Sequence, residues 1–168
     1  MSKTEYNLAH LAQMENPSVV MMVGVPGSGK SYIAEQLSEL LAIDVLSSDE
    51  CRKELTGDAN DQSMSREAWD LVRERAQDAI TDGRSVIIDG THNNQEGRRR
   101  DIAQYRSFGA KAVIGINIVT SLETAKVRNA GRERVVPEFV LERMQQNIDS
   151  APPSADDGFD YVITVDNN

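Results

Sequence analysis

The chain has 168 residues, of which 39% are apolar, so we expect one compact domain over residues 1–168, with residues 1–16 as an N-terminal extension. No apolar run approaches the roughly 18 residues that cross a bilayer, and no signal-like start is present, which predicts a cytoplasmic protein without a membrane partner. The formal net charge of −9 disfavours binding of a long nucleic acid through a broad basic face, and one cysteine with two distant histidines excludes an internal disulfide and a recognisable zinc motif.

Short apolar runs and amphipathic segments alternate along the chain. The run Ser18–Val23, bounded by a proline and a glycine, is typical of a buried parallel strand. A glycine-rich turn follows it, and then a helix is predicted from apolar residues at helical spacing: Ile33, Leu37, Leu40 and Leu41. A second strand is predicted at residues 43–46. Residues 56–65 are polar and aperiodic, so we expect a surface loop before a helix with one apolar face: Trp69, Val72, Ala76 and Ile80.

The second half of the chain continues this alternation. Runs at 85–89 and 111–118 predict two more strands, with an arginine-rich helix between them. Thr120 and Glu123 have capping-box spacing and predict a helix near 122–129. Pro137 suits the first turn of a further helix, with one apolar side: Val140, Met144 and Ile148. With a last strand at 161–165, the sequence predicts an α/β fold in which helices flank a parallel sheet on both faces.

Residues 24–31 match the phosphate-binding pattern G-x-x-x-x-G-K-[ST] in full, between a predicted strand and a predicted helix. The glycines let amide N–H groups point at phosphate oxygens, and the helix N-terminus adds a favourable dipole. We expect Lys30 to neutralise the β- and γ-phosphates and Ser31 to give its hydroxyl oxygen to Mg²⁺. The alternative is a glycine-rich turn with a solvated lysine. The pattern predicts a P-loop NTPase fold that binds ATP and Mg²⁺ through these residues: Gly24, Pro26, Gly27, Ser28, Gly29, Lys30 and Ser31.

Polar stretches follow several predicted strands, at the sheet edge where ligands gather in doubly wound folds. They are S-S-D-E-C-R at residues 47–52, D-G-T-H-N-N at residues 89–94 and R-N-A-G-R-E-R at residues 128–134. The local arginines are compatible with a small anionic substrate or the end of a nucleic acid strand, in spite of the acidic total.

With these motifs, the chain resembles the 5′-kinase domain of bacteriophage polynucleotide kinases, within the small P-loop kinases that include zeta-toxin-like enzymes. The likeness covers most of the chain. It rests on G-V-P-G-S-G-K-S, on S-D-E-C-R in place of a D-D-x-R-type motif, on I-I-D-G-T-H-N-N and on R-N-x-x-R followed by V-P-x-x-V-L-x-x-M. The first motif occurs in many NTPases, and the combination is more specific. The resemblance implies transfer of the ATP γ-phosphate to the 5′-hydroxyl end of DNA or RNA.

The resemblance implies that Asp49 is the general base for the attacking 5′-hydroxyl and that Arg52 holds a phosphate of the acceptor. In a helix, positions 49 and 52 share one face, so both side chains can address one substrate. The alternative is a capping box between Ser47 and Glu50, in which Asp49 only favours the helix N-terminus and Arg52 is solvated.

Phosphoryl transfer needs stabilisation of charge on the equatorial oxygens. The resemblance places Arg132 on a lid against the transferring phosphoryl group and Arg128 near the nucleotide, with Arg134 as a weaker candidate. The alternative is a solvated basic turn that satisfies carbonyl groups at a helix end.

Asp89 ends an apolar strand, as a magnesium-orienting acid does in P-loop enzymes, and is a metal candidate together with Ser31. A turn acid without a catalytic role is an equal alternative. For His92 and Cys51 we favour structural roles, and for Arg98–Arg100 we favour a solvated helix face over a track for a nucleic acid backbone.

The sequence also bears on three other functions. The pattern D-x-D-G-T of haloacid-dehalogenase phosphatases is incomplete, because Ile87 replaces its first aspartate, so a second, phosphatase activity is not expected. A kinase for a nucleoside, sugar or other metabolite is the main alternative, and the acidic charge favours it slightly. A third alternative is a nucleotide-binding regulatory module without transfer activity. The presence of both Asp49 and Arg132 makes this alternative less favoured. The sequence leaves the oligomeric state open.

Overall fold

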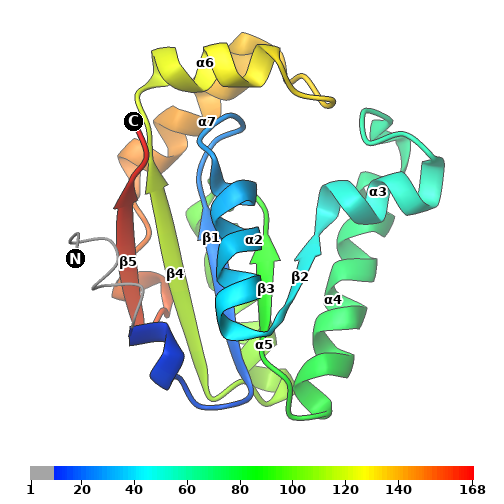
Figure 1. The fold of residues 1–168 in the computed structure, drawn as a ribbon, viewed down its shortest axis with the longest axis vertical. Helices are drawn as coiled ribbons and strands as arrows, with labels where there is room; N and C mark the ends of the chain where they lie inside the picture. Colours follow the sequence, from blue (N-terminus) through cyan, green and yellow to red (C-terminus); the bar gives the residue numbers. More distant parts are fainter. Residues whose placement is uncertain (1–9) are drawn as a thin grey trace.

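The computed structural model describes residues 10–168, in which five parallel strands form one sheet (Figure 1). The strands are β1 (Ser18–Val23), β2 (Asp44–Ser47), β3 (Val86–Asp89), β4 (Ala112–Val119) and β5 (Tyr161–Asp166). Their order across the sheet is β2-β3-β1-β4-β5. Each begins within one residue of its predicted start, because every strand contains a short, mostly apolar run next to a polar or glycine-containing turn. The predicted parallel α/β sheet is therefore confirmed.

Helices connect successive strands. They are α2 (Lys30–Leu41), α3 (Ser48–Thr56), α4 (Ser65–Thr81), α5 (Gln95–Phe108), α6 (Leu122–Ala130) and α7 (Glu138–Ser150). Short 3₁₀ turns occur at η1 (His10–Gln13), η2 (Gln62–Met64) and η3 (Ala155–Asp157). Within the described residues, no helix combines the length and apolarity that a bilayer crossing requires.

The central strand β1 is buried on both faces. Val19 and Met21 pack into a core shared with α4 and α5, whereas Val20 and Met22 pack into a second core shared with α2. This is why all its side chains except the first are apolar, without the alternation of a half-exposed strand. Because all strands are parallel, their carboxyl ends meet at one edge, where the loop after β1, helix α3 and helix α6 lie in the upper half of Figure 1.

Two local predictions are wrong. Leu40 was expected on the apolar face of its helix, but it is 68% exposed, since α2 buries only the side that carries Ile33 and Leu37. Thr120 was expected to cap the helix that follows β4, but Ser121 is the N-cap and accepts a hydrogen bond from the Thr124 amide. The Thr120 hydroxyl instead donates towards the carbonyl oxygens of Ser28 and Asn167, which lie 3.1 and 3.2 Å away.

The arginine run suggested a solvated helix face for Arg98, and this prediction is wrong. Its side chain is fully buried, and its Nε donates to Oδ2 of the equally buried Asp157 at 2.7 Å. Its Nη1 donates to the His92 carbonyl at 2.9 Å, and its Nη2 donates to the Ala151 carbonyl. The guanidinium therefore joins α5 to the loop after β3 and to the segment before β5. Its neighbours Arg99 and Arg100 are exposed, as expected.

Arg98→Ala should strongly destabilise the fold, because it leaves the Asp157 carboxylate buried without its partner. We expect a loss of about 3–5 kcal/mol in the free energy of unfolding, measured by urea denaturation. The control is Arg99→Ala, an exposed change of the same type on the same helix, for which we expect less than about 0.5 kcal/mol. Equal losses in the two variants would contradict the buried role of Arg98.

Candidate active site

The phosphate-binding loop joins β1 to α2 and is shaped by two glycines with positive φ. Gly27 and Gly29 have φ values of 86° and 91°, which other residues rarely adopt. A Cβ on Gly27 would lie only 2.1 Å from the Ala125 carbonyl oxygen, so the loop can pack against α6 only with glycine there. The amide of Gly24 donates to the Thr91 carbonyl at 3.1 Å, which anchors the start of the loop. These contacts hold the loop open at the N-terminus of α2.

Lys30 and Ser31 are the first residues of α2 and lie beside Asp89. Burial lowers the pKa of Lys30, and the nearby carboxylates of Asp89 and Asp49 only partly offset this effect. A phosphate beside the ammonium would favour its charged form. The Ser31 hydroxyl donates to Asp89 Oδ2 at 2.7 Å, and Asp89 Oδ1 is buried without a hydrogen-bond partner among the described residues. A hydroxyl and a buried carboxylate with an unused oxygen fit Mg²⁺, which binds one or two carboxylates together with nucleotide phosphates.

Helix α3 brings Asp49 and Arg52 to the same site. Ser47 caps this helix, and its hydroxyl accepts from the Glu50 amide at 3.3 Å. Asp49 and Arg52 therefore lie on one helix face, and Arg52 Nη1 donates to Asp49 Oδ1 at 2.7 Å. The Arg52 side chain is only 4% exposed, so it is not the solvated arginine of the alternative interpretation. The helix cap formed by Ser47 and the ion pair between Asp49 and Arg52 are therefore present together.

The loop between α6 and α7, residues 131–137, brings two more arginines to Asp49. Arg134 Nη1 donates to Asp49 Oδ1 at 2.8 Å, and Arg132 Nη2 lies 3.5 Å from Asp49 Oδ2. The loop is held by the buried Asn129, whose amide group donates to the Val136 carbonyl and accepts from the Val136 amide. Arg134, the weaker candidate from the sequence, thus makes the closer contact.

The arginines set the ionisation of Asp49. Burial alone would raise the pKa of Asp49, but Arg134, the hydrogen bond from Arg52 and the charge of Lys30 together lower it below its ordinary value. Asp49 is therefore ionised at neutral pH and is a weak base.

Three hollows meet at Arg132. The first, of about 240 Å³, joins Lys30, Ser31 and Asp89 to Asp49 and Arg52 and is also lined by Pro26, Trp69 and Met144. The second, of about 460 Å³, opens between α2 and α3. The third, of about 230 Å³, lies on the outer side of the loop against Gly27, Gly29 and Arg128. Arg132 lines all three hollows, and its Nη1 is buried without a hydrogen-bond partner among the described residues. An unused cationic donor in this position can bind an anion.

Arg128 lies on the nucleotide side of the loop, together with a residue that the sequence did not indicate. Arg128 Nη1 donates to the Asn167 carbonyl at 3.0 Å, and Asn167 Nδ2 donates to the Ser28 carbonyl at 2.8 Å. A Cβ on Gly29 would lie 2.2 Å from the same Asn167 nitrogen. Asn167 follows β5 without any recognisable motif, so only the parallel pairing of β5 with β4 could have pointed to it.

His92 and Cys51 are both buried, in agreement with structural roles. Burial lowers the pKa of His92 in spite of the hydrogen bond that its Nδ1 makes to the Met22 carbonyl. This neutral ring fixes the loop after β3 against the central strand.

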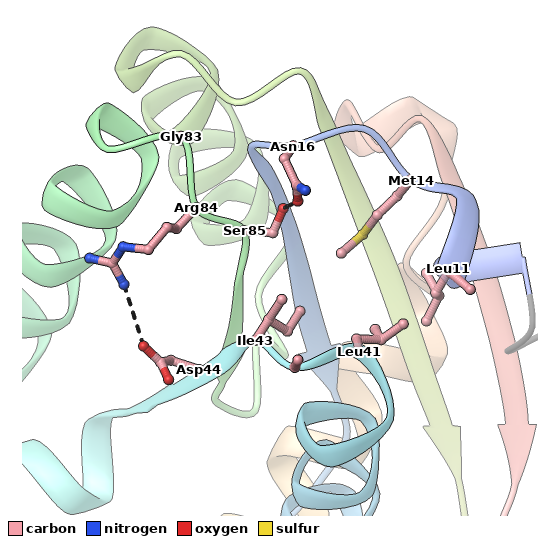
Figure 2. Close-up of a pocket in the computed structure, with 11 residues that line it drawn as sticks. Leu11, Met14, Asn16, Leu41, Ile43, Asp44, Gly83, Arg84 and Ser85 are labelled. Atoms are coloured by element: carbon pink, nitrogen blue, oxygen red, sulfur yellow. Dashed lines mark hydrogen bonds and ion pairs between the residues drawn. The ribbon is translucent and has the colours of Figure 1, made fainter.

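A further hollow, of about 270 Å³, lies at the opposite end of the sheet (Figure 2). It is formed at the amino ends of β1, β2 and β3, where Leu11, Met14 and Ile43 meet an ion pair between Arg84 and Asp44 at 3.4 Å. None of the predicted site residues lines it. Ligands of parallel sheets bind at the other edge, so this hollow is separate from the candidate active site.

Comparisons with known proteins agree with this geometry. A family model described as an AAA domain, AAA_33, matches residues 19–151, and no curated protein sequence matches the chain significantly. The chain is similar to one chain of the Pnkp1/Rnl/Hen1 RNA repair complex, with 19% identity, coverage of 89% of this chain and 48% of that one, and a TM-score of 0.72. This chain therefore spans about half the length of that relative.

Two small-molecule kinases have the same fold. A gluconokinase from Sinorhizobium meliloti 1021 is 16% identical, with coverage of 92% and 85% and a TM-score of 0.59. The APS kinase CysC from Mycobacterium tuberculosis, in complex with AMPPNP and APS, is 21% identical, with coverage of 70% and 71% and a TM-score of 0.58. At these identities the likenesses concern the fold, and together with the family match they confirm the predicted α/β P-loop fold.

Asp89→Asn should weaken the binding of ATP in the presence of Mg²⁺ by roughly tenfold or more, because the amide replaces a carboxylate oxygen beside Ser31. In EDTA, the affinity for ATP should be the same as in the unchanged protein. Calorimetric titration under both conditions makes the comparison. The control is Asp44→Asn, the same change at the opposite end of the sheet. An equal loss with and without Mg²⁺ would contradict the metal role.

Proposed function

We propose that this chain, which belongs to the AAA_33 family of P-loop kinases, transfers the γ-phosphate of ATP to the 5′-hydroxyl end of DNA or RNA. Family membership makes it an ATP-dependent kinase. The observation that carries the proposal about the acceptor is the position of Asp49, which lines the same hollow as Lys30 and Ser31 and is held there by Arg52.

The donor side follows from the loop and from α2. Lys30 and the loop amides bind the phosphates of ATP, and Ser31 and Asp89 would hold the metal ion. Mg²⁺ held by these two residues would supply positive charge to the phosphates of ATP. Because Lys30 is buried, its charge acts on the phosphates with little screening by solvent. Arg128, with Asn167, borders the hollow on the outer side of the loop, where we place the rest of the nucleotide.

On the acceptor side, Asp49 accepts the proton of the 5′-hydroxyl. The hydroxyl oxygen bonds to the γ-phosphorus while the bond from that phosphorus to the bridging oxygen breaks, which yields ADP and a 5′-phosphate. A weak base is sufficient, since in a loose transition state the attacking oxygen keeps most of its proton until late. Arg52 orients Asp49 and can also bind an acceptor phosphate.

Arg132 is the residue that we place against the transferring phosphoryl group. It lines the hollows on both the donor and the acceptor side, and its unused Nη1 is available for an equatorial oxygen. Charge stabilisation of this kind is the main contribution of a protein to phosphoryl transfer. Arg134 remains paired with Asp49 and keeps it ionised.

The structural likeness to a chain of the Pnkp1/Rnl/Hen1 RNA repair complex supports a nucleic acid acceptor. A small-molecule acceptor is the second candidate, because a gluconokinase and an APS kinase have the same fold. The specific observation in its favour is the acidic lining of the larger hollow, which contains Glu35, Glu50 and Glu133. That hollow would take an uncharged sugar or a cationic metabolite more readily than a polyanion.

An acceptor panel with γ-labelled ATP tests the proposal. The label should appear on 5′-hydroxyl DNA or RNA oligonucleotides, but not on the same oligonucleotides carrying a 5′-phosphate. Gluconate, adenosine 5′-phosphosulfate and nucleosides form the small-molecule arm. Transfer only to that arm would overturn the proposed acceptor and leave the kinase assignment intact.

Asp49→Asn should lower kcat for a 5′-hydroxyl oligonucleotide by about 10²–10⁴-fold, because the amide cannot accept the hydroxyl proton. The affinity for ATP should not change. The matched control is Glu50→Gln, which neutralises the neighbouring, exposed carboxylate on the same turn of α3. Full activity in Asp49→Asn would remove Asp49 from the mechanism.

Arg134→Ala should move the acidic limb of the pH–rate profile to higher pH. Arg134 lowers the pKa of Asp49, so its removal raises that pKa, and the base then loses its charge at a higher pH as the solution is acidified. The profile of kcat/KM between acidic and neutral pH measures the shift, with the exposed Arg143→Ala as the control. An unchanged acidic limb would show that Asp49 does not control it.

A further inference from the structure

A smaller hollow of about 190 Å³ lies between α4 and α5 and continues the acceptor hollow. Trp69 and Thr91 line both of them, so the indole stands at the boundary between the two. Arg73 and Arg100 also line the smaller hollow. The proposed mechanism uses neither Trp69 nor these two arginines.

The indole of Trp69 is held in a fixed position. A Cβ on Gly90 would lie 2.6 Å from its Cη2 atom, so the ring occupies the space beside a glycine. The His92 ring meets it edge-on at 5.7 Å between centroids, and the Arg73 guanidinium lies over the ring, 5.8 Å from its centroid. The side chain is only partly buried, and it borders open space on the side of both hollows. A rigid aromatic ring with a cation over one face leaves its open side for a nucleobase, which stacks through its π-face.

Charge distinguishes the two ways in which a polyanionic strand could leave Asp49. Besides Asp49, Asp89, Arg132 and Arg134, which also line the acceptor hollow, the opening between α2 and α3 carries Glu35, Glu50 and Glu133 with Lys53. The opening between α4 and α5 carries Arg73 and Arg100 with one carboxylate, Asp101, which lies 3.5 and 3.6 Å from them. Arg73 also lies 3.6 Å from Asp70, which does not line this opening. The buried Arg98 is already paired with Asp157 and adds no free charge. A strand of phosphates is therefore favoured along α4 and α5 and disfavoured along α2 and α3.

We propose that the hollow between α4 and α5, the α4–α5 subsite, binds the acceptor strand next to its 5′ end. The base of the second nucleotide stacks on Trp69, and the phosphate that follows this nucleotide lies between Arg73 and Arg100. The inference rests on the proposed function and makes it narrower, since the preferred acceptor becomes a strand of at least two nucleotides rather than a single nucleotide or a metabolite.

Tryptophan fluorescence tests the stacking step in the unmodified protein, because Trp69 is the single tryptophan of the chain. Titration with a 5′-hydroxyl tetrathymidylate should change the emission in a saturable way, at the concentrations where fluorescence anisotropy of a labelled tetrathymidylate reports binding. Binding by anisotropy without any change in Trp69 emission would overturn the proposal. No unfolding complicates this measurement.

Two sets of variants test the path of the strand. Arg73→Gln with Arg100→Gln should raise KM for the tetranucleotide by roughly tenfold, and by much less for thymidine 3′-monophosphate, because only the longer acceptor reaches both arginines. The control is Arg66→Gln with Arg99→Gln, exposed arginines of the same two helices that do not line the hollow. Trp69→Ala should raise KM for the tetranucleotide roughly tenfold, with partial rescue by Trp69→Phe. Thermal unfolding of each variant checks that the fold is retained.

The outcomes separate the subsite from the function on which it rests. Transfer to oligonucleotides with an unchanged KM in the Arg73 and Arg100 variant overturns the subsite and leaves the proposed function standing. Absence of transfer to every oligonucleotide overturns the proposed function, and the subsite with it.

Discussion

The burial of β1 on both faces determines where the donor groups of the candidate active site lie. Its apolar side chains lie between α2 on one face and α4 and α5 on the other, and its neighbours β3 and β4 are parallel to it. Backbone pairing with a parallel neighbour on each side sets the register of β1, so the loop that follows Val23 has a fixed origin. The same pairing brings Asp89, at the end of β3, within hydrogen-bond distance of Ser31. The geometry of the candidate metal site is therefore a consequence of sheet packing.

The site is locally positive in a protein whose formal net charge is −9. Arg52, Arg132 and Arg134 surround a single carboxylate, Asp49, and Lys30 lies nearby in a buried position. Such a cluster is unfavourable without an anion, because desolvated cations repel one another and keep unused donors. The unpartnered Nη1 of Arg132 is one sign of this excess. In the proposed function, phosphate groups supply the missing negative charge, and the cluster offers them a preorganised field.

Local patterns in the sequence predicted the sheet and the donor site, since each depends on neighbouring residues. The strands are short, mostly apolar runs, and the phosphate loop needs its glycines at fixed spacing. Other contacts join residues that are far apart in the sequence, and these could not be predicted. In the sequence, nothing distinguishes Arg98 from its exposed neighbours, because its partner Asp157 lies 59 positions later. Arg134 contacts Asp49 across 85 positions, and Asn167 reaches Ser28 across 139. No periodicity encodes such contacts, so the sequence could predict the residue types of the site but not their pairing.

Donor and acceptor groups belong to different parts of the molecule, which explains how one fold can phosphorylate different substrates. Lys30 lies at the start of α2 and Asp89 at the end of β3, next to the core. The acceptor hollow is lined from α3, from α4 and from the loop between α6 and α7. Apart from Trp69, the side chains that line this hollow lie outside the two cores of the sheet. The fold shared with a gluconokinase and an APS kinase therefore constrains the donor chemistry strongly and the acceptor weakly. The acceptor has to be inferred from the side chains that line the hollow, which here include Asp49, the buried Arg52 and the partly buried Trp69.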